Sequence, residues 1–189
     1  MWPWEHLAIG YLAFSVLVHL TLRRPPTGAE CLLVALGTQF PDLVDKPLAW
    51  VFGVLTSGTS MAHSLFVAVP LSVFVLVAAR RYGRTAAAAA FVVGYLLHLP
   101  GDILYGPLLL GRDVSVDALL WPFVRPPETA TRSVELFGRI EGYVTLYRAA
   151  VARPEATAYL LFEATLLGGA VVRWVADGRP FPTLRLGHR

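Results

Sequence analysis

Apolar runs dominate the chain and predict membrane helices. Four stretches have the length and apolar character of a spanning helix: residues 7–22, 62–79, 86–99 and 159–175. At about 1.5 Å rise per residue, the longer runs cover roughly 25 Å, which is close to the hydrocarbon thickness of a bilayer. A fifth and shorter stretch, residues 29–40, suits a helix packed among others. The pattern predicts an all-α fold, a polytopic membrane helical bundle of about five spans.

Turn-forming residues divide this bundle into parts. The cluster Arg23-Arg24-Pro25-Pro26-Thr27-Gly28 should reverse the chain, so that the first two helices form a hairpin. Proline, glycine and serine within residues 46–60 predict a short interfacial piece and a flexible loop. We expect three units: a four-helix membrane core over residues 1–110, an extramembrane region over 111–158, and a last membrane helix with a basic tail over 159–189.

The extramembrane region differs in composition from the rest of the chain. Six arginines and six acids occur between residues 111 and 155. Apolar side chains recur there at three- and four-residue steps: Val134, Phe137, Ile140, Val144 and Tyr147. This spacing predicts an amphipathic helix that opens near Thr131 or Ser133. Such a helix either packs on the protein's own surface or lies on the membrane surface.

The composition agrees with a membrane protein. Apolar residues make up 56% and charged residues 15% of the chain, against about 45–50% and about 25% in soluble domains, and the mean hydropathy is +0.57. These values exclude disordered, collagen-like and coiled-coil classes. Cys31, the single cysteine, allows neither an intramolecular disulfide nor a thiolate zinc cluster. The first six residues lack the basic segment and cleavage site of a signal peptide, so we expect the first helix to remain in the mature protein.

Basic residues indicate an orientation. The net charge is +3, but the arginines flank apolar spans, where they set membrane topology, so no nucleic-acid partner is expected. Before residue 100, five arginines lie on one side, at Arg23, Arg24, Arg80, Arg81 and Arg84, and Lys46 alone lies on the other. The positive-inside rule then predicts a multi-pass protein of the cell membrane with cytoplasmic arginine loops and a cytoplasmic C-terminus.

Histidines and aspartates occur at the ends of the predicted helices that lie away from the arginines. Because successive helices reverse direction, the start of the first, the end of the second, the start of the third and the end of the fourth share one side. The six ionisable residues at these ends are His6, Asp42, Asp45, His63, His98 and Asp102. Ionisable side chains near a bilayer are costly, so their convergence indicates function. The predicted topology turns this face outward.

The residue types favour a metal site. His98 and Asp102 are four positions apart and share a helix face if the helix continues through Pro100-Gly101. Imidazole and carboxylate ligands suit zinc, with manganese or iron as alternatives, and the six residues could hold one or two ions. Taken singly, Asp42 could be a helix cap, and His63 a buried hydrogen-bonded histidine. Their convergence favours metal binding.

Five short motifs in this order are similar to those of a known family. They are His6, Pro41-Asp42-Leu43-Val44-Asp45, His63-Ser64, His98-Leu99-Pro100-Gly101-Asp102 and Trp121-Pro122. The chain resembles the membrane-bound metal-dependent hydrolases of the YdjM type, a family also described as inner-membrane-associated and LexA-binding. The resemblance implies a membrane metal site and hydrolase activity.

The motif before the serine departs from the family pattern. Members commonly carry His-Arg-Gly-x-Thr-His, whereas this chain reads Gly58-Thr59-Ser60-Met61-Ala62-His63 and lacks the first histidine, the arginine and the threonine. The ligand order also resembles that of zinc-dependent phospholipases C. That likeness implies His63, His98, Asp102 and one of Asp42 or Asp45 around one zinc, and His6 with a bridging Asp102 around a second.

The sequence therefore predicts a membrane-embedded metal-dependent hydrolase that acts on an ester or phosphoester through metal-activated water. Of Asp42 and Asp45, one should bind the metal, and the other should orient a ligand or take the water's proton. A lipid or lipid-linked phosphate is the natural substrate class for a site at the bilayer rim. The alternative is a non-catalytic membrane protein that binds a partner and has a structural metal site. A transporter is disfavoured because the helix centres are nearly bare of charge.

Overall fold

The computed structural model describes residues 1–127 and 136–181, and within them every regular element is a helix. The six α-helices are α1 (Pro3–Leu22), α2 (Gly28–Trp50), α3 (Leu65–Arg81), α4 (Thr85–Leu110), α5 (Leu136–Val151) and α6 (Thr157–Ala176). Two short 3₁₀ segments, η1 (Asp117–Leu120) and η2 (Pro154–Ala156), interrupt the connections. The predicted all-α class is confirmed.

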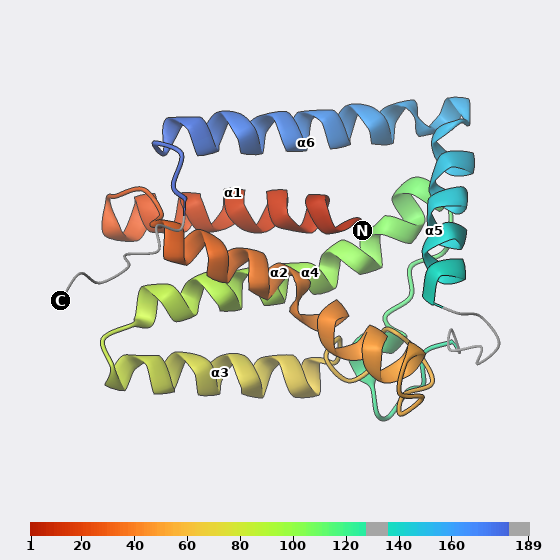
Figure 1. Ribbon diagram of the computed structural model, residues 1–189, viewed down its shortest axis with the longest axis horizontal. Helices are drawn as coiled ribbons and strands as arrows, with labels where there is room; N and C mark the ends of the chain where they lie inside the picture. The colour runs from red at the N-terminus through yellow and green to blue at the C-terminus, as the bar shows by residue number, and fades with distance from the viewer. Residues whose placement is uncertain (128–135, 182–189) are drawn as a thin grey trace.

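Five helices run lengthwise and one crosses them. In Figure 1, α1, α2, α3, α4 and α6 alternate in direction along the long axis, and α5 lies across the end where α4 stops and α6 begins. Helix α4 is central, since it packs against α1, α2 and α3, while α6 packs on α1. The α1–α2 and α3–α4 connections, with Arg23, Arg24 and Arg84, lie at the opposite end from α5, as does the last turn of α3 with Arg80 and Arg81.

Three of the about five predicted spans are supported. Helices α1, α4 over Thr85–Leu109, and α6 are long and apolar enough to cross a membrane. Helix α3 has only 17 residues, and α2 contains Asp42, Asp45 and Lys46. Only 11% of the apolar window of α6 is buried, so most of its apolar side chains face outward, as in a helix that contacts lipid.

Two helices extend beyond their predicted ends. The sequence predicted that α2 stops near Phe40 and α4 near Asp102, but α2 continues to Trp50 and α4 to Leu110. An interior proline removes one backbone hydrogen bond and bends a helix without ending it when neighbouring helices support both halves. Here α2 contains two prolines and α4 contains two. Residues 46–50, predicted as an interfacial piece, therefore belong to α2.

Glycines let α2 and α4 approach closely. A Cβ atom built on Gly94 of α4 would lie 2.6 Å from the Val34 carbonyl oxygen, and one on Gly37 of α2 would lie 2.1 Å from the Phe91 carbonyl oxygen. Neither position has room for a side chain. Small residues at helix crossings allow such backbone contact in membrane proteins. The crossing places the C-terminal halves of α2 and α4 side by side, which brings Thr38, Asp42 and His98 together.

The predicted amphipathic helix is present as α5. Its predicted start near Thr131 or Ser133 and the stripe residue Val134 lie outside the described residues, as does the basic tail from residue 182. Phe137 and Ile140 are 81% and 50% exposed, so the first turns of α5 leave their apolar face open. Its last turns pack against the protein, where Ala150 joins Leu109, Ala156 and Tyr159 in a buried cluster.

Candidate metal centre

Four side chains from three parts of the chain direct donor atoms to one point. They are Asp42 from α2, His63 just before α3, and His98 and Asp102 from α4, and one ligand atom of each lies within 4.8 Å of the others. His63 and His98 are buried, with side chains 2% and 0% exposed, whereas Asp42 and Asp102 keep 12% and 24% of theirs exposed. We call these four side chains the donor group.

Most distances from the imidazole nitrogens of the donor group are close to the edges of a tetrahedral metal site. The Nε2 atoms of His63 and His98 are 3.2 Å apart. Asp102 Oδ2 lies 3.4 Å from His63 Nε2 and 3.2 Å from His98 Nε2. Asp42 Oδ1 lies 3.6 Å and 3.9 Å from the same two nitrogens. Zinc bonds to nitrogen and oxygen of about 2.0–2.2 Å give tetrahedral edges of roughly 3.3–3.6 Å. The distances that involve Asp102 are close to these edges, and the longer of the two from Asp42 exceeds them.

Hydrogen bonds outside the donor group fix both imidazole rings. His98 Nδ1 donates to the Thr38 backbone carbonyl at 2.6 Å, and His63 Nδ1 donates to Asp45 Oδ2 at 2.8 Å. Neither acceptor can donate, so both Nδ1 atoms carry hydrogen and both Nε2 atoms of the neutral rings present lone pairs. A metal-binding histidine usually donates a hydrogen bond to a carboxylate or carbonyl from its other ring nitrogen, the one that does not bind the metal.

Each carboxylate of the donor group also has one oxygen held from outside. Lys46 donates to Asp42 Oδ2, and His6 Nε2 contacts Asp102 Oδ1 at 2.9 Å. The Met1 amino group lies 2.5 Å from the same Asp102 oxygen. Asp42 Oδ1, which faces the imidazoles, is buried and has no hydrogen-bond partner among the described residues. A buried unpaired carboxylate oxygen is costly, and a cation within the donor group would satisfy it.

The structure separates the two aspartates that the sequence left open. Asp42 contributes to the donor group, whereas Asp45 is fully buried behind His63. Its carboxylate accepts from the backbone N–H groups of Ser60 at 2.8 Å and Ala62 at 2.9 Å, besides the His63 ring. Asp45 therefore holds the 57–63 segment and the His63 ring in place.

His6 reaches the edge of the donor group. Its ring stacks on His98 with centroids 3.9 Å apart, and its Nε2 contacts the outer oxygen of Asp102. Its Nδ1 is buried and has no hydrogen-bond partner in the described parts of the chain. Gly101 permits this approach, because a Cβ there would lie 2.9 Å from His6 Cε1. The assignment of His6 to a second metal ion stays a prediction.

The charges around His63 favour its protonated form in the metal-free protein. Burial alone lowers the pKa of the imidazole, but the carboxylates of Asp102, Asp45 and Asp42 outweigh that effect and raise the pKa to about 9. Because His63 Nδ1 already carries its hydrogen, the extra proton resides on Nε2, the atom that faces the donor group. The group thus attracts a cation, either a proton or a metal ion.

A cavity of about 340 Å³ opens beside the donor group and shares two of its walls, His63 and Asp102. Leu99, Ile103, Pro107 and Leu119 make much of its surface apolar. The polar residues Thr59, Arg112, Asp113, Ser115 and Asp117 also line it. Sequence reasoning missed these polar positions, since they lie in connections with no regular spacing. It also missed Thr38, whose contribution is a backbone carbonyl and leaves no signal in the residue type.

Two motifs of the family resemblance meet beside this cavity. The Ser64 side chain caps α3 by accepting from the Phe66 backbone N–H at 3.1 Å, and its hydroxyl donates to the Trp121 carbonyl at 2.5 Å. The motifs around His63 and Trp121 are therefore in direct contact. This contact fixes the η1 segment, which carries Asp117 and Leu119, over the cavity.

Comparison with known proteins gives one family. No curated protein and no solved structure matches the chain. The profile of the family described as YdjM inner membrane protein matches residues 1–178 and so covers all the helices and the donor group. With that match over nearly the whole chain, the protein belongs to the YdjM inner membrane protein family.

Proposed function

We propose that the donor group binds one divalent transition metal ion, with zinc as the first choice. Three observations support this: the near-tetrahedral spacing of two imidazole nitrogens and two carboxylate oxygens, the outside hydrogen bonds that fix both rings, and the unpaired Asp42 Oδ1. Imidazole with carboxylate is a hard-to-borderline set that also accepts manganese or iron. The ion would neutralise two partly buried carboxylates at the end of an apolar bundle.

We propose further that the protein is a metal-dependent hydrolase of an ester or phosphoester. The observation that carries this proposal is the 340 Å³ cavity that shares His63 and Asp102 with the donor group. Its volume is within the usual range of small-molecule sites. Its walls combine apolar side chains with Arg112, a pattern that suits an amphiphilic substrate with an anionic group, such as a lipid or a lipid-linked phosphate.

A metal ion bound here would lower the pKa of water toward about 7 and polarise the scissile carbonyl or phosphoryl group. The residues of the chain have separate tasks in this proposal. Asp45 and the Thr38 carbonyl keep the two imidazoles oriented, and His6 and Lys46 hold the outer oxygens of the two carboxylates. Arg112 would bind the anionic part of the substrate, and the apolar wall would bind its chain.

The position of Asp45 argues against its use as the proton acceptor. Its oxygens are occupied by backbone N–H groups and by His63, and it is absent from the cavity wall. We therefore propose Asp42 as a ligand and Asp45 as a positioning residue. Asp113 and Asp117 are the described cavity carboxylates outside the donor group, so one of them is the candidate general base.

One observation favours a non-catalytic alternative. The donor group already supplies four protein ligands, and a closed four-coordinate site is typical of structural zinc, whereas catalytic zinc keeps a position for water. In that case the ion would only tie α2, α4 and the segment before α3 together. The membrane protein would then serve to bind a partner.

Cobalt substitution separates these two functions. The purified protein is loaded with Co²⁺, and its visible spectrum is recorded before and after addition of acetate or inorganic phosphate. A hydrolase should show a spectral change with the added anion, because a coordination position is exchangeable, and should hydrolyse at least one of a set of phospholipids, lipid phosphates and aryl esters. Arg112→Gln should weaken substrate binding without loss of metal. An unchanged spectrum together with no turnover would establish the structural alternative.

A further inference from the structure

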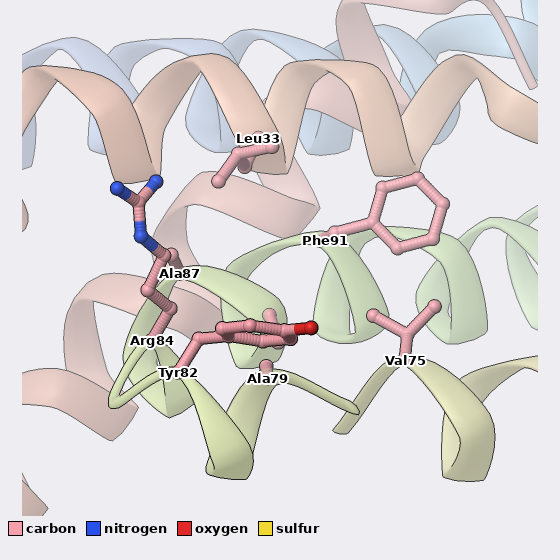
Figure 2. Close-up of a pocket in the computed structure, with 8 residues that line it drawn as sticks. Leu33, Val75, Ala79, Tyr82, Arg84, Ala87 and Phe91 are labelled. Carbon is pink, nitrogen blue, oxygen red and sulfur yellow. The ribbon is translucent and has the colours of Figure 1, made fainter. Parts of the chain in front are cut away.

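A second cavity, unrelated to the donor group, lies at the arginine end of the bundle. It is an open groove of about 660 Å³ between α3 and α4. Figure 2 shows Val75 and Tyr82 on the α3 side, Ala87 and Phe91 on α4, and Leu33 above them on α2. The Arg84 side chain extends across one end of the groove toward α2 (Figure 2). The groove is therefore apolar along its length and cationic at one end.

The sequence explains why this space exists. Residues 86–90 are five consecutive alanines, so the first turns of α4 offer no large side chain to fill the gap. Helix α3 buries only Ala68 and Ser72, both in its first half. Its second half is not packed tightly against α4, and Ala79 and Ala87 line the groove where the two helices separate.

The charge at the end of the groove is not neutralised within the described residues. Arg80 and Arg81 end α3 and Arg84 follows in the α3–α4 connection, and none of the three has an ion-pair partner in the part of the chain that the structure describes. Two other arginines at this end of the bundle do have partners. Arg24 pairs with Glu30 at 2.6 Å, and Arg173 pairs with Asp177 at 3.0 Å. One of these cations, Arg84, lines the open apolar groove, and the other two follow Ala79, which also lines it.

We propose that this groove binds one anionic phospholipid, with an acyl chain along the groove and the phosphate at Arg84. The α3–α4 connection lies at the end of an apolar membrane helix, which is the depth at which lipid headgroups lie. Clustered basic residues attract anionic headgroups, and arginine binds phosphate through two parallel hydrogen bonds. Charge complementarity thus selects an anionic lipid over a neutral one, and the groove selects an amphiphile over free phosphate.

Native mass spectrometry of the delipidated full-length protein in detergent tests this proposal. Phosphatidylglycerol and phosphatidylcholine with identical acyl chains are added separately, and retention of a single lipid is measured. The unmodified protein should retain phosphatidylglycerol about fivefold better or more, since one basic residue near a membrane surface is worth about that factor. Arg84→Gln should abolish most of this preference and leave phosphatidylcholine retention unchanged.

Two further variants distinguish binding in the groove from nonspecific binding elsewhere on the protein. Ala87→Leu fills the groove and should lower retention of both lipids while the thermal unfolding midpoint stays near that of the parent. Arg23→Gln removes a cation at the same end but outside the groove and should change nothing. Equal retention of both lipids by all variants would overturn the proposal, because the lipid would then be nonspecific. Displacement of the bound lipid by glycerol phosphate alone would also overturn the proposal, because the acyl chain would then not matter. So would a dimer without lipid that Ala87→Leu dissociates, because a second copy of the chain would then occupy the groove.

Discussion

The imidazoles of His63 and His98 are the most tightly constrained side chains of the donor group. Each is almost fully buried, and each has its Nδ1 hydrogen on an acceptor from another element: Asp45 on α2 for His63, and the Thr38 carbonyl for His98. This pairing leaves the Nε2 atoms 3.2 Å apart with lone pairs facing the same point. The chemistry proposed here therefore depends on two residues that never touch a metal ion.

Removal of a donor should remove the ion. We expect the purified protein to retain about one equivalent of a divalent transition metal, and His98→Ala or Asp102→Ala to lose it, because three remaining donors hold an ion more weakly. Elemental analysis of the folded, size-selected protein measures this. His19→Ala, whose ring contacts Arg173 away from the donor group, should retain the metal. Full metal content in both donor variants would contradict the assignment.

Asp45→Asn tests the positioning role. The amide no longer accepts as strongly from His63 Nδ1, so metal affinity should fall by about 10- to 100-fold while a saturating ion concentration still fills the site. Competition with a chromophoric chelator measures the affinity. Glu141→Gln, an exposed change on α5, serves as the control. If Asp45→Asn lost the metal at saturation as well, Asp45 would be a ligand.

The pH dependence should differ in sign between the metal-free and metal-loaded proteins. Because the pKa of His63 is raised to about 9, protonated His63 stabilises the metal-free fold below about pH 6.5, and this contribution is lost as the pH rises through 9. A metal ion needs neutral His63, so its affinity should rise over the same range. Thermal unfolding with and without zinc between pH 6 and 9 measures both trends. Parallel pH curves would contradict the prediction.

At the scale of the helices, α2 and α4 position most of the donor group. Their crossing at Gly37 and Gly94 sets the distance between Asp42 on one helix and His98 and Asp102 on the other. The helix continues through Pro100-Gly101, so His98 and Asp102 keep the four-residue spacing that places both on one face. The distance between the donors on α2 and those on α4 therefore depends on the backbone contact at the crossing.

Gly94→Ala should therefore both destabilise the fold and weaken metal binding by the donor group. The added Cβ would lie 2.6 Å from the Val34 carbonyl oxygen, a clash with backbone that forces the helices apart. We expect a loss of about 1–3 kcal/mol in unfolding free energy, the usual cost of overpacking, together with weaker metal binding. Gly169→Ala on α6 meets nothing within 4 Å and should leave metal binding intact. Equal behaviour of the two variants in thermal unfolding and metal titration would refute this prediction.

Residue patterns predicted the elements better than their ends. Hydrophobic runs located α1, α3, α4 and α6, and the alternation of helix direction brought His6, Asp42, His63, His98 and Asp102 to one end, where the structure places them. The prolines of α2 and α4 read locally as helix ends, but packing across the glycine crossing outweighs one lost hydrogen bond. Arg112 and Asp117, which line the cavity, were not predicted, because only tertiary contacts bring them close to the donor group.

At the scale of the whole molecule, chemistry and basic charge lie at opposite ends. The donor group and its cavity adjoin the end with α5. The α1–α2 and α3–α4 connections and the last turn of α3, which together carry five arginines, lie at the other end (Figure 1). The positive-inside rule then predicts that the arginine end faces the cytoplasm. The described arginines of residues 111–155 lie on the opposite side, in a segment long enough to be translocated regardless of its charge.

Cysteine labelling in intact cells tests this orientation. In a Cys31→Ala background, Leu43→Cys lies beside the donor group and Tyr82→Cys lies in the arginine connection. A membrane-impermeant maleimide should label residue 43 from outside and residue 82 only after permeabilisation. Labelling of residue 82 alone from outside would invert the predicted topology, and equal labelling of both would exclude opposite sides.

The donor group also has a consequence for the order in which the protein is made. Its members are drawn from positions 42, 63, 98 and 102, so the ion-binding geometry does not exist until synthesis has passed residue 102 and α4 has packed on α2. A metal ion can thus assist neither insertion of α1 nor formation of the α1–α2 hairpin. An ion bound at the proposed site would stabilise only the assembled bundle, by mass action. In a cell starved of metal, we therefore expect newly made chains to insert and form the helical bundle, and to lack only the stability that the ion would add.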